Sequence, residues 1–352
     1  MNYNSYDRFQ GAWLGSIIGE ALGQNDRTHV SNYQKIINYQ FCDWIETREK
    51  IAWDIVRVQR VETQYIVEQL TPLLSTGIAM RSKSSRVPLD GDRTSDFNNI
   101  YNSSISITSA SNFLLALLPI ITFAQNNGAI CTELIGKCNL KSVRTVEIKE
   151  DILLWTRLLS LTFANLFQLK NINVSIILKL LLGGVEVRTT SSIAKWNAVG
   201  DAIKHGFSLQ QLTEQISQIN KNNSDSNVTL MATDAICLAL YCFASTPHNF
   251  MLSVQCASHL PSNLSQSVAA LTATISGAYN GITGIPRNWR NAVDFHPGFQ
   301  QAIATCDCLY QTWLGTYKPN NRVMLYNPSL HALATPKIIQ PRQNFKVISQ
   351  NL

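Results

Sequence analysis

Glycine recurs at every fourth position near the start of the chain, at 11, 15, 19 and 23 in the stretch GAWLGSIIGEALG. In a helix, each glycine costs roughly 1 kcal/mol relative to alanine. A spacing of four places all of them on one helical face, where the missing side chains let another backbone approach closely. The stretch therefore predicts a buried central helix over about 8–24, and Glu20 is the one acidic residue between its glycines.

A second stretch, SVAALTATISGAYNG at 267–281, has small residues with the same spacing. Its small positions are 269, 273, 277 and 281, which share one face of a helix expected over 262–282. Two such faces can cross closely, so we expect these two helices to pack against each other. From spacing alone, the crossing indicates tight core packing and no particular chemistry.

Helical periodicity also dominates the rest of the chain. Strand-like alternation is confined to VEVRT at 185–189. The pattern predicts a single compact all-α domain over 1–316, followed by an extended tail over 317–352 that contains several prolines. The further helices are expected at about 57–77, 106–126, 128–139, 150–169, 172–184, 190–204, 208–221, 228–246, 248–258 and 298–316.

Composition argues against several classes of function. The net charge is +6 over 352 residues and the basic residues are scattered, so we expect no nucleic-acid partner. The first ten residues are polar, unlike a signal peptide, and the longest uncharged apolar run, 111–125, is too short to span a bilayer. None of the eight cysteines forms a CxxC pair, which favours reduced, buried thiols in a cytoplasmic protein.

Three stretches together resemble one protein family. RFQGAWLGSIIGEALG at 8–23 resembles the opening motif of the ADP-ribosylglycohydrolase family, which includes dinitrogenase reductase-activating glycohydrolase. SVAALTATISGAYNGITGIPRNW at 267–289 is similar to the closing helix of that family, and SNFLLALLPIITF at 111–123 to its proline-containing central helix. The resemblance implies an all-α fold and a hydrolase with two magnesium ions in a central cleft, which hold an ADP-ribose unit and a water.

The resemblance also implies where the metal ligands would lie. Two Mg²⁺ ions need several converging oxygen ligands, which the family supplies as carboxylates in a T-D-D-T and a D-T-D-T motif. The first motif falls on Arg60, Val61, Glu62 and Thr63 of this chain. Valine therefore replaces one aspartate, and the longer glutamate replaces the other.

The second motif departs further from the family pattern. It falls on Leu264, Ser265, Gln266 and Ser267, so both aspartates are absent and only the two hydroxyl positions are retained. Leucine has no ligand atom, and glutamine offers a neutral carbonyl. With Glu20 at the acidic position of the opening motif, two carboxylates would face four positive charges. We therefore expect neither a magnesium pair nor another cofactor.

Two uses remain open for the retained acids. Glu20 and Glu62 are compatible with one weak cation site, and an ion pair of Arg60 with either acid is an equal alternative. The former cleft would then be lined by Glu20, Glu62 and the residues equivalent to the lost ligands, which are Thr63, Ser265, Gln266 and Ser267.

These departures predict a catalytically inactive relative of the family, a pseudoenzyme. It would bind a protein partner or a nucleotide-like small molecule through the former cleft or the outer surface. One alternative is an active hydrolase of ADP-ribosyl or related N- or O-glycosidic bonds, with a single-metal or metal-free site in which Glu20 and Glu62 are catalytic. A second alternative is a structural subunit of a larger assembly.

Overall fold

The structure is a computed structural model, and helices fill most of the chain that it describes. Twelve α-helices and one 3-10 turn are formed there, and the described residues contain no β-strand, which confirms the predicted all-α class. The described residues are 5–24, 31–39, 44–45, 48–49, 51–53, 107–124, 146–163, 181, 190–223, 232–294 and 297–314.

Several predicted segments lie outside the described residues. They are the helices expected over 57–77 and 128–139, nearly all of the one expected over 172–184, the strand candidate at 185–189 and the tail over 317–352.

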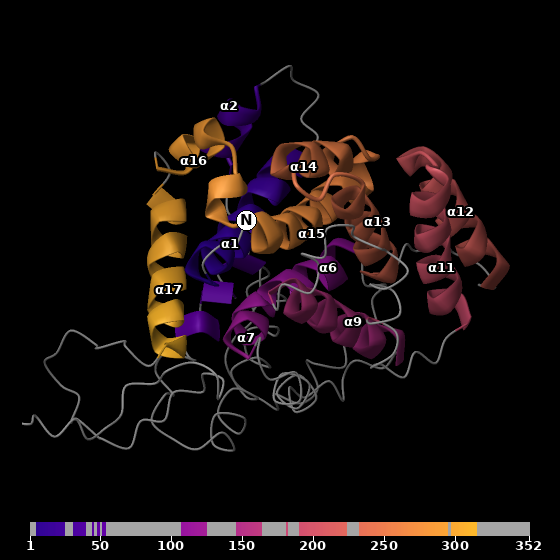
Figure 1. The fold of residues 1–352 in the computed structure, drawn as a ribbon, viewed down its shortest axis with the longest axis horizontal. Helices are drawn as coiled ribbons and strands as arrows, with labels where there is room; N and C mark the ends of the chain where they lie inside the picture. Colours follow the sequence, from indigo (N-terminus) through magenta and orange to yellow (C-terminus); the bar gives the residue numbers. More distant parts are fainter. Residues whose placement is uncertain are drawn as a thin grey trace, which may run out of the picture.

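Helices α1 (Ser5–Gly23) and α15 (Ser262–Asn280) cross at the centre of the molecule (Figure 1). An added Cβ on Gly11 would lie 2.3 Å from the carbonyl oxygen of Gly277, and one on Gly19 would lie 2.3 Å from that of Ala269. Real Cβ atoms essentially never come so close to another heavy atom. The predicted crossing is therefore confirmed, with the two backbones in direct contact.

The same contacts show that the two helices run antiparallel. The partner positions on α15 fall from 277 to 269 as those on α1 rise from 11 to 19. Between them, a Cβ on Gly15 would lie 2.4 Å from the oxygen of Ala273. A four-residue spacing on both helices keeps the small residues in register over three turns, because both repeats advance along the axis at the same rate.

Other helices surround this central pair on several sides (Figure 1). Helix α17 packs against α1, and α13, α14, α6 and α9 pack against α15. Their bounds are Ile107–Ala116 for α6, Val146–Phe163 for α9, Ala232–Ser245 for α13, Phe250–Ser258 for α14 and Pro297–Trp313 for α17.

The remaining elements are shorter or more peripheral. Helices α11 and α12 form a pair at one edge of the molecule, and α11 packs against α13 (Figure 1). None of the described helices is long and apolar enough to cross a membrane. The bounds are Asn32–Ile37 for α2, Leu118–Phe123 for α7, Thr190–His205 for α11, Leu209–Asn223 for α12, Arg287–Asp294 for α16 and Ile282–Gly284 for the 3-10 turn η4.

One predicted helix is divided in the structure. The segment expected as a single helix over 106–126 breaks at Leu117 into α6 and α7. Pro119 has no N–H to continue the hydrogen-bond ladder of α6, so it begins a new helix whose first amide bonds return to the oxygen of Leu117.

Two short helices are not predicted by the periodicity. Ser31 caps the start of helix α2, and its hydroxyl accepts a hydrogen bond from the Gln34 amide at 3.3 Å. Helix α16 begins after Pro286, whose carbonyl accepts from the amides of Trp289 and Arg290 at 3.0 Å. Both are too short to show a hydrophobic repeat, so only these start signals could have revealed them.

Candidate functional site

Glu20 lies in the last turn of α1, where α15 begins its crossing, and only 2% of its surface is exposed. The Trp44 indole donates a hydrogen bond to its Oε2. The amide nitrogen of Gln266 donates a second hydrogen bond, 3.0 Å long, to its Oε1. Both carboxylate oxygens therefore accept N–H groups from distant parts of the chain.

The neighbouring glycines bring Gln266 within reach of Glu20. Gly19 and Gly23 lie on the face of α1 that meets α15, and a Cβ on Gly23 would lie 2.6 Å from the Cα of Gln266. Any side chain at Gly23 would push the start of α15 away. The glycine repeat thus sets the distance between the two helices and the position of the amide at Glu20.

The residues around Gln266 also close onto the end of α1. The Ser265 hydroxyl donates a 2.7 Å hydrogen bond to the carbonyl oxygen of Gly23, one of the last carbonyls of the helix. Leu264 and Ser267 are buried, with 2% and 3% of their surfaces exposed. The structure therefore brings Glu20, Ser265, Gln266 and Ser267 to one region, whereas Arg60, Val61, Glu62 and Thr63 lie outside the described residues.

The sequence did not predict a role for Trp44. A buried arginine holds Trp44 in place. Arg48 donates hydrogen bonds to the oxygen of Trp13 at 3.1 Å and to the hydroxyl of Ser16 at 2.8 Å, both on α1. It also pairs with Glu49 at 3.1 Å and lies over the Trp13 ring, 4.2 Å from its centroid. Burial lowers the pKa of the Arg48 guanidinium. This anchor fixes the segment that carries Trp44 against α1.

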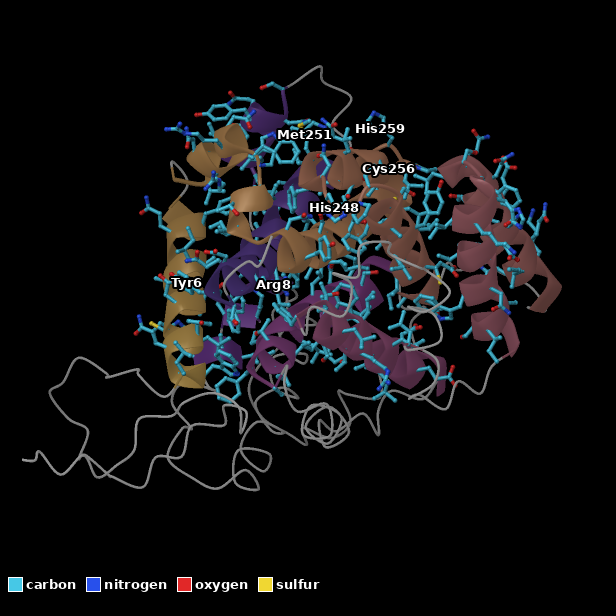
Figure 2. All side chains as sticks on the ribbon, in the orientation of Figure 1. Tyr6, Arg8, His248, Met251, Cys256 and His259 are labelled. Atoms are coloured by element: carbon cyan, nitrogen blue, oxygen red, sulfur yellow. The ribbon has the colours of Figure 1, made fainter. Side chains whose placement is uncertain are left out.

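The opening motif contributes one further buried cation, Arg8 (Figure 2). Its guanidinium donates hydrogen bonds of 3.4 and 3.3 Å to the carbonyl oxygens of Thr162 and Phe163, in the last turn of α9. A cation at a helix C-terminus is favourable because the free carbonyls there carry partial negative charge. Arg8 thus links α1 to α9 and is a structural residue.

A second buried polar cluster joins α9, α11, α12 and α13. The Lys195 ammonium lies 2.8 Å from Oδ1 of Asp234, and their side chains are 1% and 0% exposed. Asn220 donates a 2.9 Å hydrogen bond to the other oxygen of Asp234. Asp151 accepts the amide of Thr233 at 3.1 Å and also its hydroxyl. Burial raises the pKa of Asp151 to about 7, although the Thr233 hydrogen bond opposes that shift.

The sequence did not predict this cluster, because its residues lie on four different helices and have no regular spacing along the chain. All five side chains are buried, so the cluster connects helices and presents no group to solvent. The region around Glu20 differs from this cluster, because it lies where two motifs of the sequence meet in the fold.

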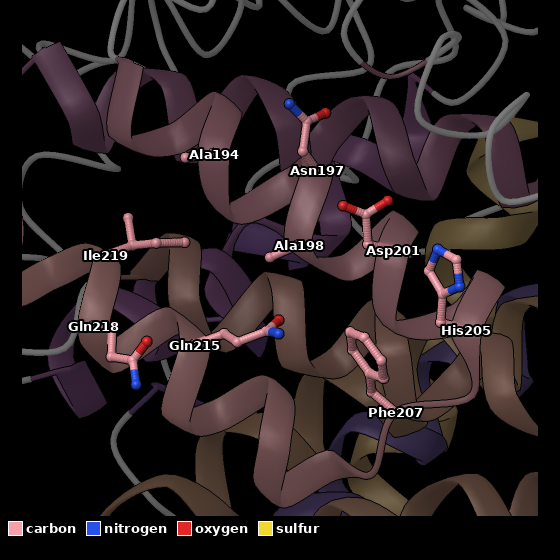
Figure 3. A pocket seen from close by; sticks show the side chains of 9 residues that line it. All are labelled: Ala194, Asn197, Ala198, Asp201, His205, Phe207, Gln215, Gln218 and Ile219. Atoms are coloured by element: carbon pink, nitrogen blue, oxygen red, sulfur yellow. The ribbon is translucent and has the colours of Figure 1, made fainter.

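A groove lies between α11 and α12, on other elements than Glu20 (Figure 3). Its volume is about 720 Å³. The exposed side chains of Asp201 and His205 lie one turn apart on α11, and the His205 ring stacks on Phe207 with 5.8 Å between centroids. The other residues that line the groove are Ala194, Asn197, Ala198, Gln215, Gln218 and Ile219.

Metal-binding side chains do not gather in the described part of the chain. No group of three or more His, Cys, Asp or Glu residues there is arranged to hold a metal ion. Among the described side chains, Glu20 accepts hydrogen bonds from the Trp44 indole and the Gln266 amide.

Comparison with known proteins agrees with this fold. The family model of ADP-ribosylglycohydrolases matches residues 169–318. Among solved structures, a chain of an "ADP-ribosylglycohydrolase-related protein complex" is 17% identical to this one, with a TM-score of 0.52 over 87% of this chain and 98% of that chain. None of the curated proteins matches this chain.

The all-α fold, with two small-residue helices that cross at its centre, is thus similar to the fold of an ADP-ribosylglycohydrolase-related protein. The resemblance predicted from the sequence is confirmed by the family model over residues 169–318 and by the similar fold of this solved structure.

Proposed function

We propose that this chain is a catalytically inactive ADP-ribosylglycohydrolase-like protein that acts by binding a protein partner or a nucleotide-like ligand. The observation that carries the proposal is the environment of Glu20, whose two oxygens accept hydrogen bonds from Trp44 and Gln266. A cation at this carboxylate would have to displace N–H groups that already compensate its burial.

The available donors do not fit two magnesium ions, which need several carboxylate oxygens in octahedral geometry. At the positions where the resemblance places aspartates, Leu264 is a buried aliphatic side chain and Gln266 directs its amide nitrogen toward Glu20. Val61 removes a third ligand in the sequence, which leaves Glu20 and Glu62. We therefore infer no metal-assisted hydrolysis at this site.

A binding role requires a folded protein with an accessible surface, and this chain has both. The groove between α11 and α12 offers a volume of about 720 Å³ with Asp201 and His205 at its rim, which supports binding outside the former cleft. The five described cysteines are free thiols, as in the reducing cytoplasm where we place the protein.

Release of ADP-ribose from modified peptides tests the proposal. The full chain is incubated with ADP-ribosylated arginine and serine peptides at millimolar Mg²⁺, and free ADP-ribose is quantified by mass spectrometry. We expect no release above the protein-free blank. Magnesium-dependent release that Glu62→Ala abolishes, and that the exposed-site control Glu214→Ala leaves intact, would overturn the proposal.

Thermal melting distinguishes the binding role from the alternative hydrolase. A ligand that binds the folded state raises Tm in proportion to the logarithm of its concentration over Kd. We expect no shift with Mg²⁺ alone, and a shift with ADP-ribose if the ligand is nucleotide-like. Metal-independent release of ADP-ribose that is lost in Glu20→Gln would instead identify an altered, metal-free hydrolase.

A further inference from the structure

Helices α13 and α14 form an antiparallel pair joined by the short turn 246–249. The hydroxyls of Thr246 and Ser253 lie 3.0 Å apart, and the Ser253 hydroxyl also donates to the carbonyl oxygen of Thr246 at 2.9 Å. These hydrogen bonds fix which residues of the two helices face each other.

Two cysteines lie one turn beyond this hydrogen-bonded pair. Cys242 precedes Thr246 by four residues on α13, and Cys256 follows Ser253 by three residues on α14. Residues three or four apart share a helical face, so the antiparallel register places the two thiols at the same level of the helix contact. The Cys242 thiol is hydrogen-bonded to Cys256.

The two thiols have different surroundings. Cys242 is fully buried, whereas Cys256 is half-buried. The hydrogen bond from Cys242 lowers the pKa of Cys256 to about 7, burial opposes this, and the nearby His259 lowers the pKa further. The same hydrogen bond and burial hold the pKa of Cys242 well above its usual value. Figure 2 shows Cys256 and His259 at the same end of α14.

A half-buried thiol with a lowered pKa next to a buried thiol is the arrangement of a peroxide-reactive cysteine and its resolving partner. The unreactive alternative, two thiols that pack only as small hydrophobes, accounts for the burial of Cys242. It does not require Cys256 to face both a thiol donor and an imidazole at the surface.

We propose that Cys256 and Cys242 are a redox-sensitive pair, in which a hydroperoxide oxidises Cys256 and Cys242 then forms a disulfide with it. The Cys256 thiolate sulfur attacks the peroxide O–O bond, so an S–O bond forms and the distal oxygen leaves as hydroxide or alkoxide, which takes up a proton. The Cys242 sulfur then attacks the sulfenic sulfur; the S–S bond forms, the S–O bond breaks, and the thiol proton leaves with hydroxide as water.

In total, two thiols give two electrons to one hydroperoxide, and the products are a disulfide, a water and an alcohol or a second water. The disulfide would link the C-terminal half of α13 to that of α14, and excess thiol would reverse it.

Peptide mapping of the peroxide-treated full chain tests the pair. The protein receives equimolar hydrogen peroxide, free thiols are alkylated, and chymotryptic peptides are analysed by mass spectrometry. Cleavage after Phe243 and Phe250 separates the two cysteines, whereas trypsin does not because 222–286 contains no lysine or arginine. We expect a cross-linked Cys242–Cys256 peptide as the main oxidation product.

Variants separate the role of each thiol. Cys242→Ala should abolish the cross-link, trap Cys256 as a dimedone-reactive sulfenic acid, and slow its alkylation at neutral pH about tenfold, because an ordinary thiol is only a few per cent ionised there. Cys237→Ala, a buried cysteine of the same helix, is the control and should leave the cross-link unchanged. If Cys242→Ala fails to fold, Cys242→Ser keeps a hydrogen-bond donor and should still trap the sulfenic acid.

Two results would overturn the inference. One is a peroxide-treated wild-type chain in which Cys256 stays a free thiol or ends as a sulfinic acid beside unmodified Cys242. The other is an alkylation rate of Cys256 that does not change in a folded Cys242→Ala variant.

Discussion

Two buried helix contacts of this protein are stabilised by opposite kinds of interaction. At the α1–α15 crossing, backbone meets backbone because Gly11 and Gly277 carry no side chains. Where α11 meets α13, the ammonium of Lys195 meets the carboxylate of Asp234. The first contact depends on the absence of side chains at the glycines, and the second depends on a pair of opposite charges.

The difference predicts how each contact responds to change. The glycine contacts of the crossing tolerate no added atom, because a new side chain would meet the rigid backbone of the facing helix, and these backbone contacts involve no titratable group. The Lys195–Asp234 contact accepts substitutions of similar shape, but it is sensitive to the loss of one partner and to the charge on the neighbouring Asp151.

Filling the crossing should have the largest effect. A Cβ on Gly277 would lie 2.0 Å from the carbonyl oxygen of Gly11, so Gly277→Val should lower the free energy of unfolding by about 5 kcal/mol or more, close to the entire stability of a domain. Urea denaturation followed by circular dichroism measures this loss. Gly206→Val is the matched control; Gly206 has a φ of 69° and no atom within 4 Å of its added Cβ, so only about 2 kcal/mol of backbone strain is expected. Equal losses in the two variants would contradict the direct backbone contact.

Breaking the ion pair should have the next largest effect. Lys195→Met leaves the Asp234 carboxylate buried without its cation and should cost about 3–4 kcal/mol in unfolding free energy. Adding Asp234→Asn removes the unpaired buried charge and keeps a hydrogen-bond acceptor for Asn220. The double variant Lys195→Met/Asp234→Asn should therefore recover about half of that loss. A double variant less stable than Lys195→Met would show that the two side chains are not coupled.

The charge of Asp151 should make stability depend on pH. Its folded pKa is raised to about 7 from an ordinary value of 3.8, so the folded state binds the proton more tightly than the unfolded state. Protonation of Asp151 therefore stabilises the fold at acid pH, and this contribution disappears as pH rises through about 7. Asp151→Asn is neutral at every pH, so its unfolding free energy relative to wild type should rise by at least about 1 kcal/mol between pH 5 and 8. A pH-independent difference between the two proteins would refute the shift.

Placing a carboxylate beside Glu20 should have a smaller effect than breaking the ion pair. Gln266→Asp replaces a hydrogen-bond donor with a second negative charge and should destabilise the metal-free protein by about 1–2 kcal/mol. Millimolar Mg²⁺ should recover part of the lost Tm in this variant and should not shift the wild type. The control is Gln215→Asp, at the groove between α11 and α12, which should show no response to magnesium. A wild-type chain that Mg²⁺ stabilises as much as Gln266→Asp would argue against the inactive site.

The sequence predicted the central pair of helices residue by residue, because the absence of side chains at a four-residue spacing is a local and unambiguous signal. It also indicated that Glu20 and Gln266 belong to one region. The resemblance that linked them relied on two motifs about 240 residues apart, which the fold brings within 3.0 Å. Their direct hydrogen bond, however, could not be predicted, because it depends on the orientation of the Gln266 amide.

Other parts of the site left no such signal. Trp44 and Arg48 come from a segment without helical periodicity, and nothing in their neighbourhood marks them as partners of α1. Lys195, Asp234 and Asp151 are spread over 84 positions of the sequence and resemble ordinary polar residues of amphipathic helices. Only the packing of α9, α11 and α13 shows that they are buried together.

The sequence by itself therefore determined the class of fold and the two small-residue faces that meet at its centre. Through the family resemblance, it also predicted that acidic side chains are replaced at Val61, Leu264 and Gln266. The tertiary structure decided which described side chains donate to Glu20: the indole of Trp44 and the amide of Gln266. The reason is physical. Helix periodicity and glycine spacing are properties of one segment, whereas the partner of a buried charge is chosen from all the segments that the fold brings around it.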